Sequence, residues 1–301
     1  MSNDTNITFQ ARGETLRLGM VSMLASAAFL LAGAAMAQDN TAPLFDLLPD
    51  AIKASGTIQV AGDPFPPYRI ISVDGETRTG LEADLLEAMV PLLGVEFENT
   101  IVASLPAMLA GLDTGRYDLT TGPLLDTVER EERFDIIPWL LSKPAYVMDG
   151  SASEAVKVLE DLCGLRVAFS AGSISEQYQT MVSDRCIAAG KPPLVDVALQ
   201  DKNTLLLAVQ SNRADAMSSQ LASALYMQAQ LPDQLYIQTD ETDQLGILHL
   251  GLVLKSKSEL SGAIVEALRM LNESGEYAAI LTRWGLGAAA QPDFELNPAS
   301  K

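Results

Sequence analysis

Hydrophobic and polar positions along the chain follow two alternating patterns. Short segments, such as residues 57–62, have the length and composition of a strand. They alternate with stretches in which apolar side chains recur at three or four positions, and in residues 80–93 Leu85, Met89 and Leu93 fall on one face of a helix. Because strand and helix patterns alternate, we predict an α/β fold.

The same patterns predict where polar side chains converge. Ligands of open α/β sheets bind beyond the carboxyl ends of the strands. Asp63, Arg130, Ser173 and Gln220 each lie just beyond such a strand end, so we expect them to meet at one site. Further strands are expected at 95–102, 118–121, 165–170, 195–199, 214–218, 235–238 and 248–254. Further helices are expected at 105–114, 154–162, 175–186, 202–211 and 259–284, and one more follows the strand 214–218 and ends at 229.

The stretch from Gly122 to Asp135 carries the most informative chemistry. We expect a glycine-containing turn after the strand 118–121, followed by a helix start at Thr127-Val-Glu-Arg130. Free N–H groups at a helix start and a planar guanidinium suit a small carboxylate. The pattern favours a solute-binding protein over an enzyme. The alternative is a surface turn with solvated charges.

The N-terminal segment has the features of an export signal. Arg12 and Arg17 precede an uncharged stretch, residues 18–37, that ends in Ala-Met-Ala. We expect cleavage before Gln38, which makes residues 1–37 a signal peptide and the protein periplasmic. An uncleaved membrane anchor is the alternative, because the stretch is about long enough to span a bilayer.

Charge and composition exclude several functions. The formal net charge is −19, and the sequence contains no lysine- or arginine-rich run. We therefore expect no binding to nucleic acid. No metal-ligand cluster, Ser–His–Asp order or phosphate loop stands out, so we expect no cofactor, no metal and no catalytic residue.

Two cysteines, Cys163 and Cys186, remain for an oxidising exported compartment. Cys163 precedes the strand 165–170, and Cys186 closes the following helix. Because a strand–helix hairpin brings its two ends together, a disulfide between them is expected. The alternative, a catalytic thiol, would have to pair with the only histidine of the sequence, His249.

Several motifs, taken in order, carry a family likeness. The sequence resembles the extracytoplasmic solute-binding proteins of family 3, the polar amino acid type, over about residues 52–286. Each motif alone is weakly specific. The motifs are Gly80-Leu-Glu-Ala-Asp-Leu85, Leu112-Asp-Thr-Gly-Arg-Tyr-Asp118, Thr127-Val-Glu-Arg130, Leu159-Glu-Asp-Leu-Cys-Gly164 with the Ala-Gly-Ser turn after it, Asn212-Arg-Ala-Asp-Ala216, and Leu271-Asn-Glu-Ser-Gly-Glu-Tyr277 with Trp284-Gly285.

The resemblance implies a fold of two α/β lobes, the type II periplasmic binding protein fold, with two crossover strands and a ligand cleft between the lobes. The crossovers are expected near 147–150 and 245–250. The expected domains are a leader at 38–50, a first lobe from 51–148 plus 248–290, a second lobe at 149–247, and a tail at 291–301.

The resemblance also assigns roles to the site residues. Arg130 matches the arginine that holds the ligand carboxylate. Asp63 matches a polar group after the first strand, Phe65 matches an aromatic that packs on the ligand, and Ser173 matches a carboxylate contact of the second lobe.

Two residues depart from the family pattern. Leu125 stands where many members have a threonine that helps to bind the carboxylate. Gln220 stands where amino acid binders commonly have the aspartate that pairs with the α-ammonium group. Because a buried cation needs an anionic partner, either Asp63 or another acid supplies that charge, or the ligand has no ammonium group. The alternative is that Gln220 is a surface cap.

The resemblance implies a periplasmic component of an ABC importer. It would bind an amino acid or another small carboxylate and deliver it to the transmembrane subunits of the permease, and we expect it to be a monomer. Two alternatives stay open: an enzyme of the same fold, like some dehydratases, or an accessory partner of a periplasmic quinoprotein dehydrogenase.

Overall fold

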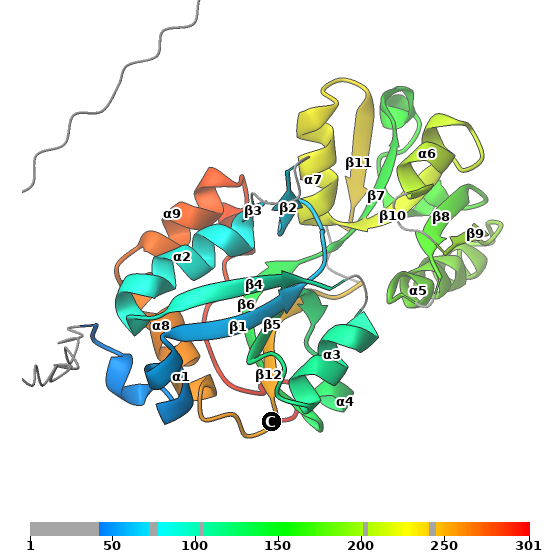
Figure 1. The fold of residues 1–301 in the computed structure, drawn as a ribbon. Coiled ribbons are helices and arrows are strands. Elements are labelled where there is room, and N and C mark those ends of the chain that lie inside the picture. The colour runs from blue at the N-terminus through cyan, green and yellow to red at the C-terminus, as the bar shows by residue number, and fades with distance from the viewer. Residues whose placement is uncertain (1–41, 73–77, 103–104, 172, 201–203, 241–244) are drawn as a thin grey trace, which may run out of the picture. The chain divides into compact units, whose positions relative to one another are not determined.

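Two five-stranded sheets with their own helices form the core of the fold (Figure 1). A computed structural model describes residues 42–72, 78–102, 105–171, 173–200, 204–240 and 245–301. The expected signal peptide therefore lies outside the described residues. In the ranges that the structure describes, none of the helices has the length and apolar character needed to cross a membrane.

The first sheet, which with its helices we call lobe one, is built from both ends of the sequence. β1 (Thr57–Gly62) pairs in parallel with β4 (Glu96–Ile101) and β5 (Leu119–Leu125). β12 (Leu248–Lys255) lies antiparallel between β5 and β6 (Phe134–Ser142). The strand order is β4-β1-β5-β12-β6, so a strand from late in the chain lies beside the strand that leads to Arg130.

Helices cover both faces of the first sheet. α2 (Leu81–Leu93), α8 (Ser261–Glu273) and α9 (Glu276–Arg283) pack against one face with Ile58 and Val60. The opposite face, with Ala61, packs against α3 (Leu105–Asp113) (Figure 1). Because successive strand residues point to opposite faces, Ile58 and Val60 lie on one face of the sheet and Ala61 on the other.

The expected helix 259–284 is two helices. α8 ends at Glu273 and α9 begins at Glu276, with Gly275 at a φ of 81° between them. A left-handed residue ends a helix, and glycine adopts that conformation without steric cost.

The second sheet and its helices form lobe two. Its strand order is β11 (Leu235–Thr239), β7 (Pro144–Asp149), β10 (Ala216–Gln220), β8 (Arg166–Ser170) and β9 (Val195–Leu199). α5 (Ser175–Ala188) packs on one face, and α6 (Leu205–Gln210) and α7 (Leu221–Gln230) pack on the other. The remaining elements are α1 (Asp50–Ser55), α4 (Val128–Glu131), the short strands Ile70–Ile71 (β2) and Arg78–Thr79 (β3), and 3-10 turns at Phe45–Leu47, Gly150–Glu154, Leu159–Leu162 and Gly287–Ala289.

The first crossover differs from the sequence expectation. The chain changes sheet at Lys143, between β6 and β7, rather than near 147–150. Residues 144–148 therefore belong to lobe two, and the expected lobe boundary is wrong there. The sequence pattern does not place the boundary there, because apolar, mostly buried residues lie on both sides of Lys143. The chain returns to the first sheet between β11, which ends at Thr239, and β12, which begins at Leu248.

The expected leader is residues 38–50. The structure describes it from residue 42 onward, and this part belongs to the core. Leu44 and Leu48 are buried in the main hydrophobic cluster of lobe one. The Leu44 N–H donates to the carbonyl of Leu92, at 2.9 Å. The expectation of a separate leader is therefore wrong for the described part of residues 38–50. Two buried leucines anchor the segment, which is too short to show the hydrophobic periodicity of a helix or a strand.

The expected tail, residues 291–301, also packs on lobe one. Phe294 is buried and meets Tyr277 edge to face, with ring centroids 5.2 Å apart. The Glu131 carboxylate accepts the backbone N–H groups of Ala299 (2.8 Å) and Ser300 (2.6 Å). The segment is therefore part of the fold, although its proline-containing sequence shows no helical or strand period.

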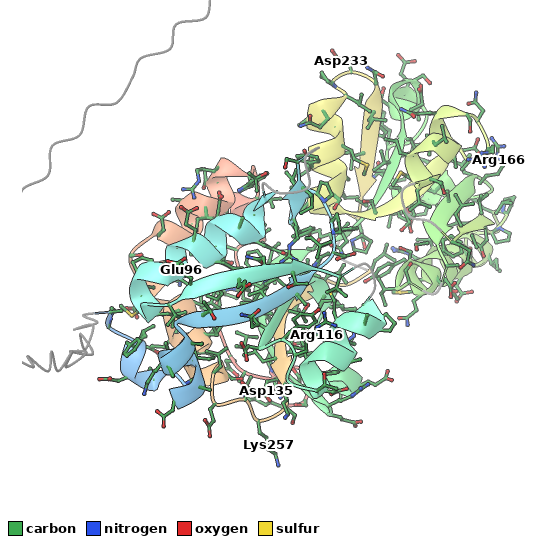
Figure 2. The ribbon with its side chains drawn as sticks, in the orientation of Figure 1. Glu96, Arg116, Asp135, Arg166, Asp233 and Lys257 are labelled. Atoms are coloured by element: carbon green, nitrogen blue, oxygen red, sulfur yellow. A yellow bond between two sulfur atoms is a disulfide. The ribbon has the colours of Figure 1, made fainter. Side chains whose placement is uncertain are left out.

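Asp135, the last residue of the stretch 122–135 that the sequence singles out, has a structural role. Its carboxylate accepts the N–H groups of Lys257 (2.9 Å) and Ser258 (3.1 Å) and the hydroxyl of Ser261 (2.7 Å). Figure 2 shows Asp135 and Lys257 near each other, at the start of β6 and after the end of β12. These bonds fix the turn that leads into α8.

Cys163 and Cys186 form the expected disulfide, with their Cα atoms 5.6 Å apart. Cys163 follows the 3-10 turn Leu159–Leu162, and Cys186 lies near the end of α5, where it is fully buried. The bridge ties α5 to the segment before β8.

Removing this bridge is expected to destabilise the protein. The cysteines are 23 residues apart, and by the chain-entropy model a loop of that length contributes roughly 3 kcal/mol. Replacing both Cys163 and Cys186 with alanine should lower the free energy of unfolding, measured in urea, by about that amount. Thiol titration of the unfolded, unreduced protein should find no free thiol; two titratable thiols would show that the bridge does not form.

Candidate functional site

A cavity of about 730 Å³, which we call the first cavity, brings the expected site residues together. Its volume is in the range of small-molecule sites. The cavity is lined by all six residues that the sequence singles out for ligand binding: Asp63, Phe65, Leu125, Arg130, Ser173 and Gln220. Segments of both lobes therefore contribute to it.

The position of Arg130 is set by its backbone and by one hydrogen bond of its side chain. Thr127 precedes α4 (Val128–Glu131) in extended conformation, and its hydroxyl oxygen accepts the Arg130 N–H at 3.3 Å. Arg130 Nη1 donates to the carbonyl of Leu125 at 2.5 Å. Because a guanidinium has five N–H donors, this bond orients the group and leaves donors for a carboxylate.

The electrostatic surroundings of Arg130 combine burial with nearby acids. Partial burial lowers the pKa of the Arg130 guanidinium, and the carboxylates of Glu129 and Asp126 oppose that shift. Arginine stays protonated under such shifts. Burial, the hydrogen bond to Glu131 and the charge of Glu131 raise the pKa of Asp126 to about 7. Arg130 therefore brings a fixed positive charge to the wall of the cavity, and the nearby Asp126, which does not line the cavity, has a raised pKa.

The turn expected around Gly122 is not present. β5 continues through Gly122 to Leu125, because β12 pairs with it as far as the Leu250–Leu125 pair. The helix that follows has only four residues, and the N–H groups of Arg130 and Glu131 bond to the Thr127 carbonyl, both at 3.0 Å. The expectation of a glycine turn is therefore wrong, and Leu125 contributes its carbonyl group to the position of Arg130.

Asp63 and Phe65 lie in the proline-rich turn after β1. Phe65 forms an antiparallel bridge with Arg69, and its ring stacks on Tyr68 with centroids 5.7 Å apart. The Tyr68 hydroxyl donates to Gln220 Oε1 at 3.1 Å. Burial raises the pKa of Tyr68, so it stays a neutral donor. Tyr68 was not recognised from the sequence, although it is the aromatic residue that ends this turn.

A buried ion pair supports the turn. Arg69 Nη2 lies 3.3 Å from Glu82 Oε2, and both side chains are at most 5% exposed. The same guanidinium bonds to the hydroxyl of Thr121 and lies 3.4 Å from Asn99 Oδ1. The pair joins the turn to α2, β4 and β5. The sequence gives no sign of it, because its members are far apart along the chain.

Gly62, the last residue of β1, makes room for this ion pair. A Cβ atom at this position would overlap the guanidinium of Arg69. A glycine is therefore required immediately before Asp63 for the pair to form in this geometry.

Ser173 is placed by the turn after β8. Its hydroxyl donates to the Ser170 carbonyl at 2.6 Å, and its oxygen accepts the N–H of Ser175 at 3.3 Å. The hydroxyl proton is thus used within the turn. Gln220 ends β10, directly before α7, and lines the cavity from there.

Comparison with known proteins agrees with this architecture. The model of the bacterial extracellular solute-binding proteins, family 3, matches residues 58–287. The arginine-binding protein ArgT of Corynebacterium glutamicum is 27% identical over 250 residues, which cover 80% of this chain and 78% of that protein. The L-cystine-binding protein TcyJ of Escherichia coli K12 is 26% identical over 129 residues, 42% of this chain and 48% of that protein.

Solved structures share the two-lobe fold. The amino acid ABC transporter substrate-binding protein AbpA of Streptococcus pneumoniae, bound to L-arginine, has a TM-score of 0.65 at 25% identity and covers 81% of this chain and 100% of its own. The ancestral amino acid-binding protein AncCDT-1, a precursor of cyclohexadienyl dehydratase, has a TM-score of 0.64 at 23% identity. The match covers 78% of this chain and 97% of AncCDT-1. The latter likeness bears on the fold alone.

Proposed function

The chain belongs to the bacterial extracellular solute-binding proteins, family 3, and we propose that it is the periplasmic solute-binding component of an ABC importer. Its ligand would be an amino acid or another small carboxylate, delivered to the transmembrane subunits of a permease. Export through a cleaved signal over residues 1–37 is part of the proposal. The names of the relatives, an arginine-binding and an L-cystine-binding protein, support the ligand class.

The position of Arg130 in the first cavity carries the proposal. A guanidinium held by Leu125 at the wall of a cavity of small-molecule size is suited to a carboxylate. Phe65, Leu105 and Leu109 add apolar surface to the same cavity, which suits the rest of a small organic ligand.

The ammonium group of an amino acid ligand would meet an unusual environment. Gln220 provides a neutral amide, and its oxygen already accepts the Tyr68 hydroxyl. Asp63 and Glu129 are the carboxylates among the described residues that line the first cavity. We propose that the site tolerates ligands without an ammonium group better than a site with an aspartate at position 220 would.

A ligand screen with one variant that introduces a carboxylate tests this proposal. Amino acids and their keto-acid analogues should raise the melting temperature, and a ligand at a thousandfold excess over its Kd stabilises the folded state by roughly 4 kcal/mol. Gln220→Asp should shift the amino acid to keto-acid affinity ratio, measured by calorimetry, roughly tenfold or more toward the amino acid. An unchanged ratio would show that Gln220 does not face the α-substituent, and the absence of any carboxylate ligand would reject the proposed function.

An enzymatic role has no specific observation in its favour. The names of the sequence relatives describe binding proteins. A dehydratase-like reaction would need a general acid at the ligand. The carboxyl group with a pKa near 7, Asp126, is not among the residues that line the first cavity.

A further inference from the structure

A second cavity, of about 430 Å³, adjoins the first. The proline-rich turn of lobe one contributes Pro64, Phe65 and Pro66 to its wall. Lobe two contributes the turn before α5, residues of α6, the end of β10 and one side of α7. The Ser223 hydroxyl on α7 donates to the Pro66 carbonyl at 2.9 Å, so this helix and the turn are in direct contact at the cavity.

The two cavities share part of their wall. Five residues line both of them: Phe65, Ser170, Ser173, Ile174 and Gln220. The second cavity therefore lies next to a ligand whose carboxylate is held at Arg130 in the first.

The lining of the second cavity differs in charge from that of the first. The first cavity includes Asp63, Glu129, Arg130 and Arg133 in its wall. The second has no acidic or basic side chain among the described residues that line it. Its apolar wall includes Ile174, Leu205, Leu206, Met217, Met227 and Leu248.

The polar groups of the second cavity are uncharged. They are hydroxyls and one amide, among them those of Tyr178, Ser218, Tyr226 and Gln220. Ser218 is 4% exposed, and its Oγ has no hydrogen-bond partner within the part of the chain that the structure describes.

We infer that the second cavity binds the side chain of the ligand, and that this side chain is uncharged and mostly apolar. A guanidinium, ammonium or carboxylate buried against this wall would lose its hydration without gaining an opposite charge. A large aliphatic or aromatic side chain would gain by burial against the same surface. The inference rests on the proposed function, since it takes the ligand to be anchored at Arg130.

The test is calorimetry with the full mature protein and a fixed set of probes. Leucine, methionine, phenylalanine and their keto acids represent uncharged side chains, and arginine, lysine and glutamate represent charged ones. We expect the best uncharged probe to bind at least roughly tenfold more tightly than any charged one. Tightest binding by arginine, lysine or glutamate, lost in Arg130→Lys, would overturn this inference and leave the proposed function intact.

A matched pair of variants tests the location. Met227→Glu places a carboxylate in the second cavity, and Met227→Gln has the same size without charge. We expect Met227→Glu to weaken the best uncharged probe at least roughly tenfold more than Met227→Gln does. Equal affinities in the two variants would overturn the inference. If the Met227 variants do not fold, the variants Leu206→Glu and Leu206→Gln on α6 provide the same test.

Discussion

Replacing Arg130 with lysine is expected to weaken the binding of the carboxylate ligand roughly tenfold or more, a loss of about 1.4 kcal/mol or more. The Arg130 side chain is oriented by one bond, from Nη1 to the Leu125 carbonyl, and its remaining donors form a planar fork. Lysine keeps the charge but cannot bind a carboxylate through two parallel N–H groups. The measurement is calorimetry with the best ligand from the screen.

Arg166→Lys is the matched control for this prediction. Arg166 lies on lobe two (Figure 2). It pairs with Asp215 at 2.7 Å and lines neither cavity. The ligand affinity of Arg166→Lys should equal that of the unaltered protein. If Arg130→Lys also binds normally, with an unchanged melting temperature, the carboxylate is held elsewhere.

Replacing Glu82 with glutamine is expected to lower the free energy of unfolding by about 3–5 kcal/mol, because it leaves the Arg69 guanidinium buried without its opposite charge. Glu82 and Arg69 are 3.3 Å apart and almost inaccessible to solvent. Burial raises the pKa of Glu82, and the Arg69 charge opposes this shift. The measurement is urea unfolding at neutral pH.

Glu276→Gln is the control for the buried pair. Glu276 lies 3.4 Å from Arg283, and both side chains are about half exposed. Breaking an exposed pair of this kind should cost less than about 1 kcal/mol. If Glu82→Gln costs no more than Glu276→Gln, then Glu82 is protonated in the folded protein, and the turn that carries Asp63 and Phe65 is not held by an ion pair.

The sequence alone was sufficient for the features that depend on local pattern. The strand 57–62 was predicted with the bounds that it has in the structure. The helix at 80–93 was predicted because apolar spacing and a final glycine are local signals. The helix start at Thr127 was predicted from Thr-x-Glu-Arg, a spacing set by one turn of helix, and the disulfide followed from the number and placement of the cysteines.

Features that depend on distant partners could not be predicted. Gly122 and Pro123 have the composition of a turn, but β12, from late in the chain, pairs with this segment and extends the strand. The change of sheet at Lys143 lies within a run that is apolar on both sides. Arg69 and Tyr68 find their partners, Glu82 and Gln220, only after folding, and no local pattern marks such pairs.

The crystal structure of the protein with the tightest-binding carboxylate from the screen is the most direct test of the account. We predict the ligand carboxylate within hydrogen-bond distance of the Arg130 guanidinium, and the side chain in the second cavity against Met217 and Met227. A ligand bound in the cavities with its carboxylate away from Arg130, or bound outside both cavities, would contradict it.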